Sequence, residues 1–138
     1  MVESGTQHVT DARAAELARA YALADWRVFV LPHGIDSADK LKAAAQAVLP
    51  LDPPLNPETP MNWNAFTDSL VGGIYDVEAD KIAIVWPDAG CLARSEAHSF
   101  EDAVDILGGL PEDFSPPEET HRPKDVAVVI ADLANQRA

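Results

Sequence analysis

Residues 62–70 read NWNAFTDSL, and we expect the rest of the chain to be organised around this stretch. The apolar residues of this stretch continue at helical spacing to residue 74, and we expect them to form one buried stripe: Trp63, Phe66, Leu70 and Ile74. Asn64 and Asp68 are four residues apart on another face, with Thr67 beside them. Asn62 is placed to cap the helix, because its side-chain oxygen can accept a hydrogen bond from a backbone N–H two or three residues later. The pattern predicts a short helix with an apolar back and a small polar front.

Three apolar runs bounded by Pro, Gly or charged residues predict β-strands at residues 27–31, 81–86 and 125–130. The continuous apolar character of the first run predicts a strand that is buried on both faces. Residues 1–9 are polar, and we expect them to fray. For residues 131–138 we expect a brief helical turn.

Capping residues predict where the other helices begin. One helix starts at Thr10 or Asp11 and continues to about Asp25, and two more start after Ser37 and Ser99. Two glycine pairs follow the apolar stripes of helices, and we expect them to end those helices as left-handed residues: Gly72-Gly73 and Gly108-Gly109. Between the second and third helices, residues 50–60 carry five prolines and predict a stiff loop.

The order of these elements predicts the fold class. Strands that are separated by helices need crossover connections, which give parallel pairing. We therefore predict an α/β fold in which helices pack on a three-stranded parallel sheet, with an extra N-terminal helix. The chain divides into an N-terminal extension, residues 1–25, and a main domain, residues 26–138, within one compact domain overall.

Composition narrows the class of partner. The 138 residues include 23 acids and 10 Lys or Arg, for a formal net charge of −13. This charge disfavours nucleic acid and favours a basic protein partner, although acidity also simply keeps a protein soluble. Cys91 is the only cysteine, so no intrachain disulfide can form. We see neither a signal peptide nor an apolar run of the roughly 20 residues that a membrane span needs, and we expect a cytoplasmic protein that does not bind membranes.

No motif predicts an enzyme, a metal site or a cofactor. The four histidines, at positions 8, 33, 98 and 121, lack the spacing of zinc ligands. Cys91 lies outside any nucleophile motif, and both glycine pairs follow helices, whereas a phosphate-binding loop precedes one. One enzymatic hypothesis remains, acid–base chemistry by a pair among the clustered carboxylates Asp68, Asp76, Glu78 and Asp80. A solvated acidic rim is the simpler interpretation of these residues.

Residues 62–70 also resemble the second helix of the barstar family, intracellular inhibitors of secreted bacterial ribonucleases. The family pattern there is Asn-Leu-Asp-Ala-Leu-Trp-Asp-Cys-Leu, and four residues of this chain match it: Asn62, Ala65, Asp68 and Leu70. Asn64 replaces an acid, Thr67 replaces Trp, and Ser69 replaces Cys. The order of the predicted elements over residues 26–131 also agrees with this family, and the resemblance therefore implies a barstar-like domain at residues 26–138.

The resemblance implies that Asp68 enters the active site of a basic ribonuclease and imitates a substrate phosphate. It makes these residues the candidate partner-binding set: Asp68, Asn64, Thr67, Asn62, Trp63 and, in the preceding loop, Glu58. The implied protein is a monomer when free, binds no nucleic acid directly and needs no cofactor. The alternative is an acidic immunity or regulatory module that keeps the fold without inhibiting a ribonuclease, which the changes at Asn64 and Thr67 and the added N-terminal helix favour.

Overall fold

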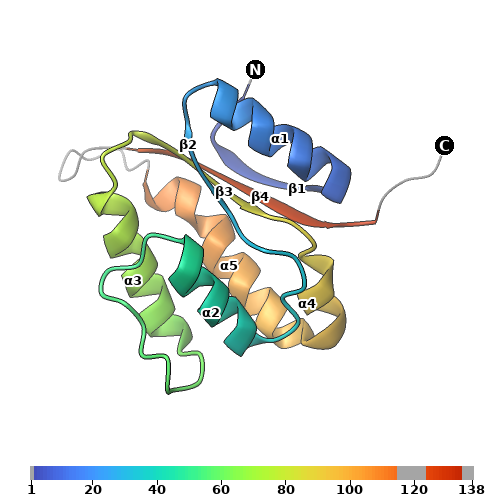
Figure 1. Cartoon of the computed structure of the whole chain (residues 1–138), viewed down its shortest axis with the longest axis vertical. Coiled ribbons are helices and arrows are strands. Elements are labelled where there is room, and N and C mark those ends of the chain that lie inside the picture. The colour runs from blue at the N-terminus through green and yellow to red at the C-terminus, as the bar shows by residue number, and fades with distance from the viewer. Residues whose placement is uncertain (1, 115–123, 135–138) are drawn as a thin grey trace.

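The computed structural model describes residues 2–114 and 124–134 and contains one parallel β-sheet (Figure 1). Its strands are β1 (Gly5–Thr10), β2 (Arg27–Val30), β3 (Lys81–Trp86) and β4 (Asp125–Leu133), and their order across the sheet is β1-β4-β3-β2. The two central strands are the most apolar: Ile82 to Trp86 and Val126 to Ala131 are buried. The predicted α/β class and parallel pairing are therefore confirmed.

The sheet has four strands, so the prediction of three strands and a frayed N-terminus was wrong. β1 pairs with β4 from Gly5 opposite Ala127 to His8 opposite Ile130. It was missed because an edge strand needs little apolar character, and Thr6, Gln7 and His8 are polar. β4 also continues through Leu133, where we expected a helical turn; residues 135–138 lie outside the described part of the chain.

β2 is the opposite edge strand of the sheet and is not buried on both faces as predicted. Val30 is 45% exposed, and Arg27 is also exposed. The guanidinium of Arg27 lies over the Phe29 ring, 5.3 Å from its centre, and so covers part of this edge strand. An apolar run alone does not distinguish a central strand from an edge strand.

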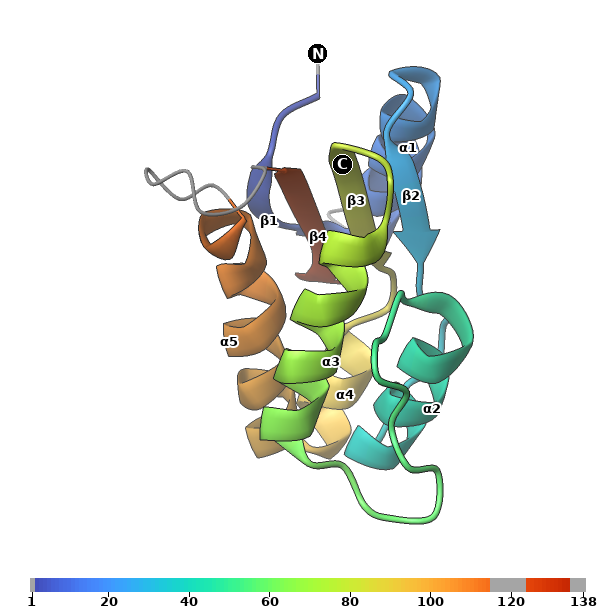
Figure 2. The ribbon, with the colours of Figure 1, turned by 90° about the vertical axis from the view of Figure 1, so that its left-hand side faces the viewer.

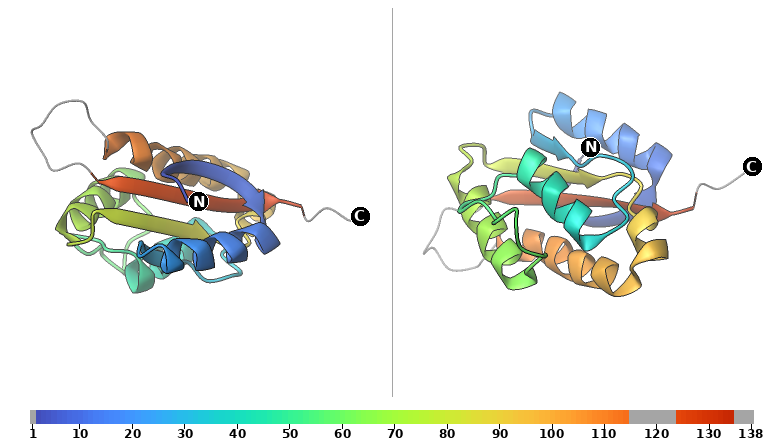
Figure 3. Two further views of the ribbon diagram at one scale, coloured as in Figure 1. Left: turned by 90° about the horizontal axis from the view of Figure 1, so that it is seen from above. Right: turned by 60° about the horizontal axis from the view of Figure 1, so that its bottom comes forward.

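Helices cover both faces of the sheet, unequally. Helix α1 (Asp11–Leu23) packs on one face, and the other face carries α2 (Ala38–Val48), α3 (Trp63–Asp76), α4 (Gly90–Ser95) and α5 (Ala97–Asp113) (Figures 1 and 2). In the view from above, α1 lies on the near face (Figure 3, left). Small residues of the central strands, Ala83 and Ala127, lie in the core beneath α1. The larger core lies between the sheet and the other four helices.

The predicted N-caps are confirmed for three helices. The side-chain oxygens of Thr10, Ser37 and Asn62 accept hydrogen bonds from the backbone N–H three residues later, at 3.1–3.2 Å. The cap predicted at Ser99 is displaced, since α5 begins at Ala97 and Ser99 instead donates to the Glu96 carboxylate at 2.8 Å. Helix α4 was not predicted, because its six residues are too few to show a helical period.

The glycine pairs do not end their helices, and that prediction was wrong. Helix α3 continues past Gly73 to Asp76, and α5 continues past Gly109 to Asp113. A Cβ atom on Gly73 would lie 1.7 Å from the carbonyl oxygen of Pro50, and one on Gly72 would lie 2.5 Å from that of Asp52. These glycines therefore let the loop before α3 cross the helix at backbone contact.

Candidate protein-interaction surface

Helix α3 is fixed to the core by its apolar stripe, as predicted. Phe66, Leu70 and Ile74 are fully buried, and Trp63 is half-buried with its ring edge-on to Phe66 at 6.1 Å. The Asn62 side chain accepts from the Ala65 N–H at 3.1 Å and fixes the first turn. The position of the outer face of α3 is therefore set by packing on its inner face.

The predicted polar front lies on the outside of α3. Asn64 and Asp68 are exposed, while Thr67 is half-buried. The Thr67 hydroxyl donates to the Trp63 carbonyl at 2.8 Å, so its polar group is directed back onto the helix. Within residues 2–114 and 124–134, the Asp68 carboxylate has no hydrogen-bond or ion-pair partner. It is free to accept hydrogen bonds from another molecule.

The proline loop before α3 is held by a row of polar side chains on α2, which the sequence analysis did not identify. Lys42 Nζ donates to the carbonyls of Asn56 and Thr59. Gln46 forms two hydrogen bonds with the Leu55 backbone, at 2.6 and 2.9 Å. The third member, Asp39, accepts from the backbone N–H of residue 61 at 3.1 Å. Positions 39, 42 and 46 share one face of the helix, and this spacing was the available signal.

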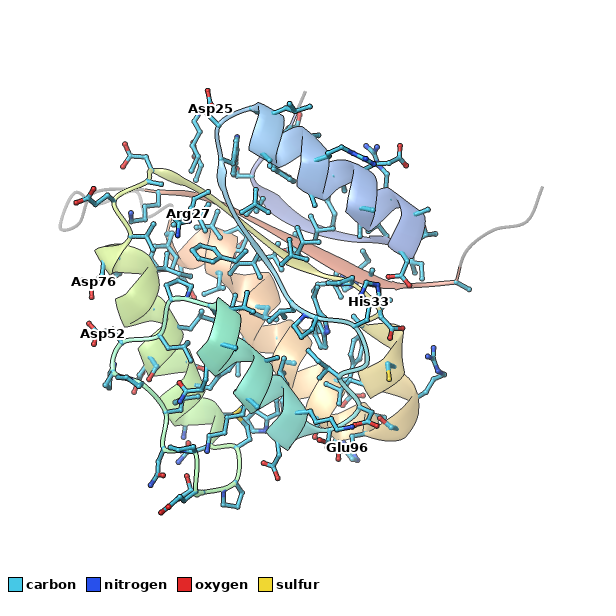
Figure 4. The ribbon with its side chains drawn as sticks, in the orientation of Figure 1. Asp25, Arg27, His33, Asp52, Asp76 and Glu96 are labelled. Carbon is cyan, nitrogen blue, oxygen red and sulfur yellow. The ribbon has the colours of Figure 1, made fainter. Side chains whose placement is uncertain are left out.

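The loop before α3 runs beside that helix (Figure 2) and carries further carboxylates, among them Asp52 (Figure 4). Glu58 is exposed on the loop. Asp52, where the loop crosses α3, lies next to Asp76 at the end of the helix (Figure 4). The hydrogen bond between these two carboxyl groups, together with their charge repulsion, raises the pKa of Asp52. The surface therefore concentrates negative charge.

The charged side chains of residues 43–80 all have one sign, and Lys124, which packs against this segment from later in the chain, is buried. Residues 43–80 contain no Lys, Arg or His, and they contain six acids: Asp52, Glu58, Asp68, Asp76, Glu78 and Asp80. The base that precedes them, Lys42, is only 6% exposed and directs its ammonium to loop carbonyls. We call the exposed part of α3 and residues 52–62 the acidic surface. Its negative potential attracts cationic groups and repels phosphates.

A second polar group lies where the carboxyl ends of the strands meet. His8 Nδ1 lies 2.9 Å from Asp132 Oδ2. The Asp88 N–H donates to Asp11 at 2.6 Å, and the Gly34 N–H donates to Asp88 at 3.1 Å. These contacts join segments that are distant in the chain, and no local pattern predicted them. In the described ranges, no group of three or more His, Cys, Asp and Glu residues is arranged to hold a metal ion.

Three further findings concern the thiol, the fourth histidine and the membrane span considered from the sequence. Cys91 lies half-buried in α4. His121 lies outside the described residues. No helix in the part of the chain that the structure describes has the length and apolar content to cross a membrane.

Comparison of the chain with protein-family models, with curated proteins and with solved structures finds no match. The barstar resemblance and the partner that it implies therefore stay predictions.

Proposed function

We propose that this chain is a barstar-like inhibitor that binds a basic bacterial ribonuclease and blocks its active site. The acidic surface provides the contact, with Asp68 at the substrate-phosphate position of the enzyme. Asn64 lies one helical turn before Asp68, Asn62 and Trp63 lie at the start of the same helix, and Glu58 extends the contact onto the loop.

The observation that carries this proposal is the unpaired, outward carboxylate of Asp68 on a helix whose other side is locked into the core. A carboxylate in this state forms charge-assisted hydrogen bonds to Arg or Lys with little ordering cost. Its surroundings add to the attraction, because residues 43–80 supply acids and no bases. Electrostatic steering of this kind accelerates association with a cationic protein.

The geometry of Thr67 favours a second candidate, an acidic immunity or regulatory module that binds a basic protein without inhibiting a ribonuclease. In the barstar pattern this position is Trp, which supplies contact area. Here the hydroxyl of Thr67 is used within the helix, and the side chain is half-buried. In this second candidate the partner is still a basic protein, but binding does not block an active site of that protein.

Inhibition assays distinguish the two candidates. The full chain is titrated against several basic, guanyl-preferring bacterial ribonucleases over a range of RNA concentrations, with a neutral or acidic ribonuclease as the control enzyme. An active-site inhibitor raises the apparent KM for RNA and leaves kcat unchanged, and it acts only on the basic enzymes. Binding of the basic enzymes without a change in RNA cleavage supports the second candidate. If the chain neither binds nor inhibits any of them, the ribonuclease target is wrong.

A further inference from the structure

A groove separates α2 from the proline loop at the edge of the acidic surface. It has a volume of about 490 Å³. Ala43 of α2 lines one wall, Pro57 and Pro60 line the other, and the carboxylates of Asp39 and Glu58 also border it. We call it the α2–loop groove. Its walls suit an alkyl chain, and its carboxylates suit a cation at the end of that chain.

Two carboxylates, Asp39 and Glu58, and one ammonium, Lys42, line this groove, so its charge is negative overall. Asp39 and Glu58 are both exposed. Asp39 uses one oxygen for the Met61 N–H, and within the described ranges the Glu58 carboxylate has no partner. Lys42 lines the groove with its alkyl chain, but its ammonium is bound to the carbonyls of Asn56 and Thr59. The groove therefore presents two carboxylates that can receive an external cation.

The groove is preformed. Lys42 and Gln46 bind the loop backbone at residues 55, 56 and 59, and Asp39 binds it at residue 61. These contacts fix the proline wall relative to α2 before any partner arrives. A preformed site avoids the entropic cost of ordering a loop on binding.

We propose that the α2–loop groove receives an arginine side chain of the basic partner protein. A guanidinium is planar and weakly hydrated, so it can lie against prolines and still donate to the carboxylates of Asp39 and Glu58. A lysine ammonium is more strongly hydrated and offers no planar fork for a carboxylate. This inference rests on the proposed function, since it assigns part of the acidic surface to one residue type of the basic partner.

The test uses the full chain and a small probe. Amide NMR spectra are recorded while N-acetyl-L-arginine methylamide is added, with N-acetyl-L-lysine methylamide as the comparison probe. We expect saturable shifts at Ala43, Glu58 and Thr59, and weaker binding of the lysine probe. Glu58→Gln keeps the size of the side chain and should weaken arginine binding by about threefold or more. Asp105→Asn removes one exposed charge from α5, outside the groove, and should leave binding unchanged.

The inference is overturned if the chemical shifts do not saturate, or if the amides of acidic residues outside the groove shift as much as those inside it. It is also overturned if Glu58→Gln and Asp105→Asn weaken binding equally. Equal affinity for the lysine probe also overturns the assignment to arginine. The titration needs no ribonuclease, so the two proposals can fail separately. If the arginine probe binds in the groove but no ribonuclease is inhibited, only the proposed inhibitor function is refuted. If a ribonuclease is inhibited but the arginine probe does not bind, only the assignment of the groove to arginine is refuted.

Discussion

Substitution of Gly73 by alanine separates two explanations of the glycine pair in α3. If Gly73 served only to end a helix, alanine would be harmless or stabilising at this position, because the helix in fact continues. The added Cβ would lie 1.7 Å from the carbonyl oxygen of Pro50, 2.3 Å from its carbonyl carbon and 2.8 Å from the Leu51 nitrogen. All three atoms belong to the backbone, so no side-chain rotation relieves the clash, and the loop must move off the helix.

The magnitude follows from two opposing effects. Overpacking of this severity costs about 3 kcal/mol, at the upper end of the usual range. Replacing glycine by alanine inside a helix returns about 1 kcal/mol. The net expectation is a loss of about 2 kcal/mol, which in a chain of 138 residues lowers Tm by roughly 8 °C.

Gly109→Ala is the matched control, because the same substitution inside α5 meets nothing within 4 Å. It should stabilise the fold by about 0.5–1 kcal/mol. Both variants are compared with the wild type by urea unfolding and by thermal unfolding. A Gly73→Ala variant as stable as Gly109→Ala would refute the close approach of the loop to α3.

Three further predictions concern hydrogen bonds and charge. Tyr21→Phe removes a 2.6 Å hydrogen bond to a backbone carbonyl and should cost about 1 kcal/mol at pH 7. Burial raises the pKa of Tyr21 above 10.0, so the free energy of unfolding of the wild type should fall as the pH rises above about 10. This Tyr21 contribution should be absent when the Phe variant is unfolded over the same pH range. Asp76→Asn removes the neighbour that raises the pKa of Asp52, so Tm should increase at pH 7 and the Asp52 pKa should fall toward 3.8. The pKa is measured by NMR titration of the carboxyl groups, and an unchanged Asp52 pKa would contradict the pairing. Gln46→Ala should accelerate hydrogen exchange of the Leu55 amide, and unchanged exchange would show that the loop is held by other contacts.

The parts of the fold that were predictable are those in which local sequence and tertiary environment agree. β3 begins and ends where its apolar run does, because both faces of a central parallel strand are covered. The caps at Ser37 and Asn62 were predictable because they satisfy nearby N–H groups. β1 was not, since its stability comes from pairing with β4, more than a hundred residues away in the chain.

The candidate site was predictable to a similar extent. The buried stripe and the exposure of Asn64 and Asp68 follow from helical spacing, and the structure has them as expected. The role of Gly73 did not follow, because a glycine that ends a helix and one that admits a crossing backbone look the same in sequence. The spacing of Asp39, Lys42 and Gln46 indicates one polar face of α2, but it does not identify the loop carbonyls that Lys42 binds up to 17 positions away.

The most direct test of the central claim is the dissociation constant of the complex between this chain and a basic bacterial ribonuclease, measured for wild type, Asp68→Ala and Asp105→Ala. A carboxylate that is desolvated against cationic groups contributes about 2–5 kcal/mol, so Asp68→Ala should weaken binding by about 30-fold or more, through faster dissociation. Asp105→Ala removes the same charge from α5 and should change binding by only a few-fold. Equal dissociation constants for the two variants would contradict the account and move the interface away from α3.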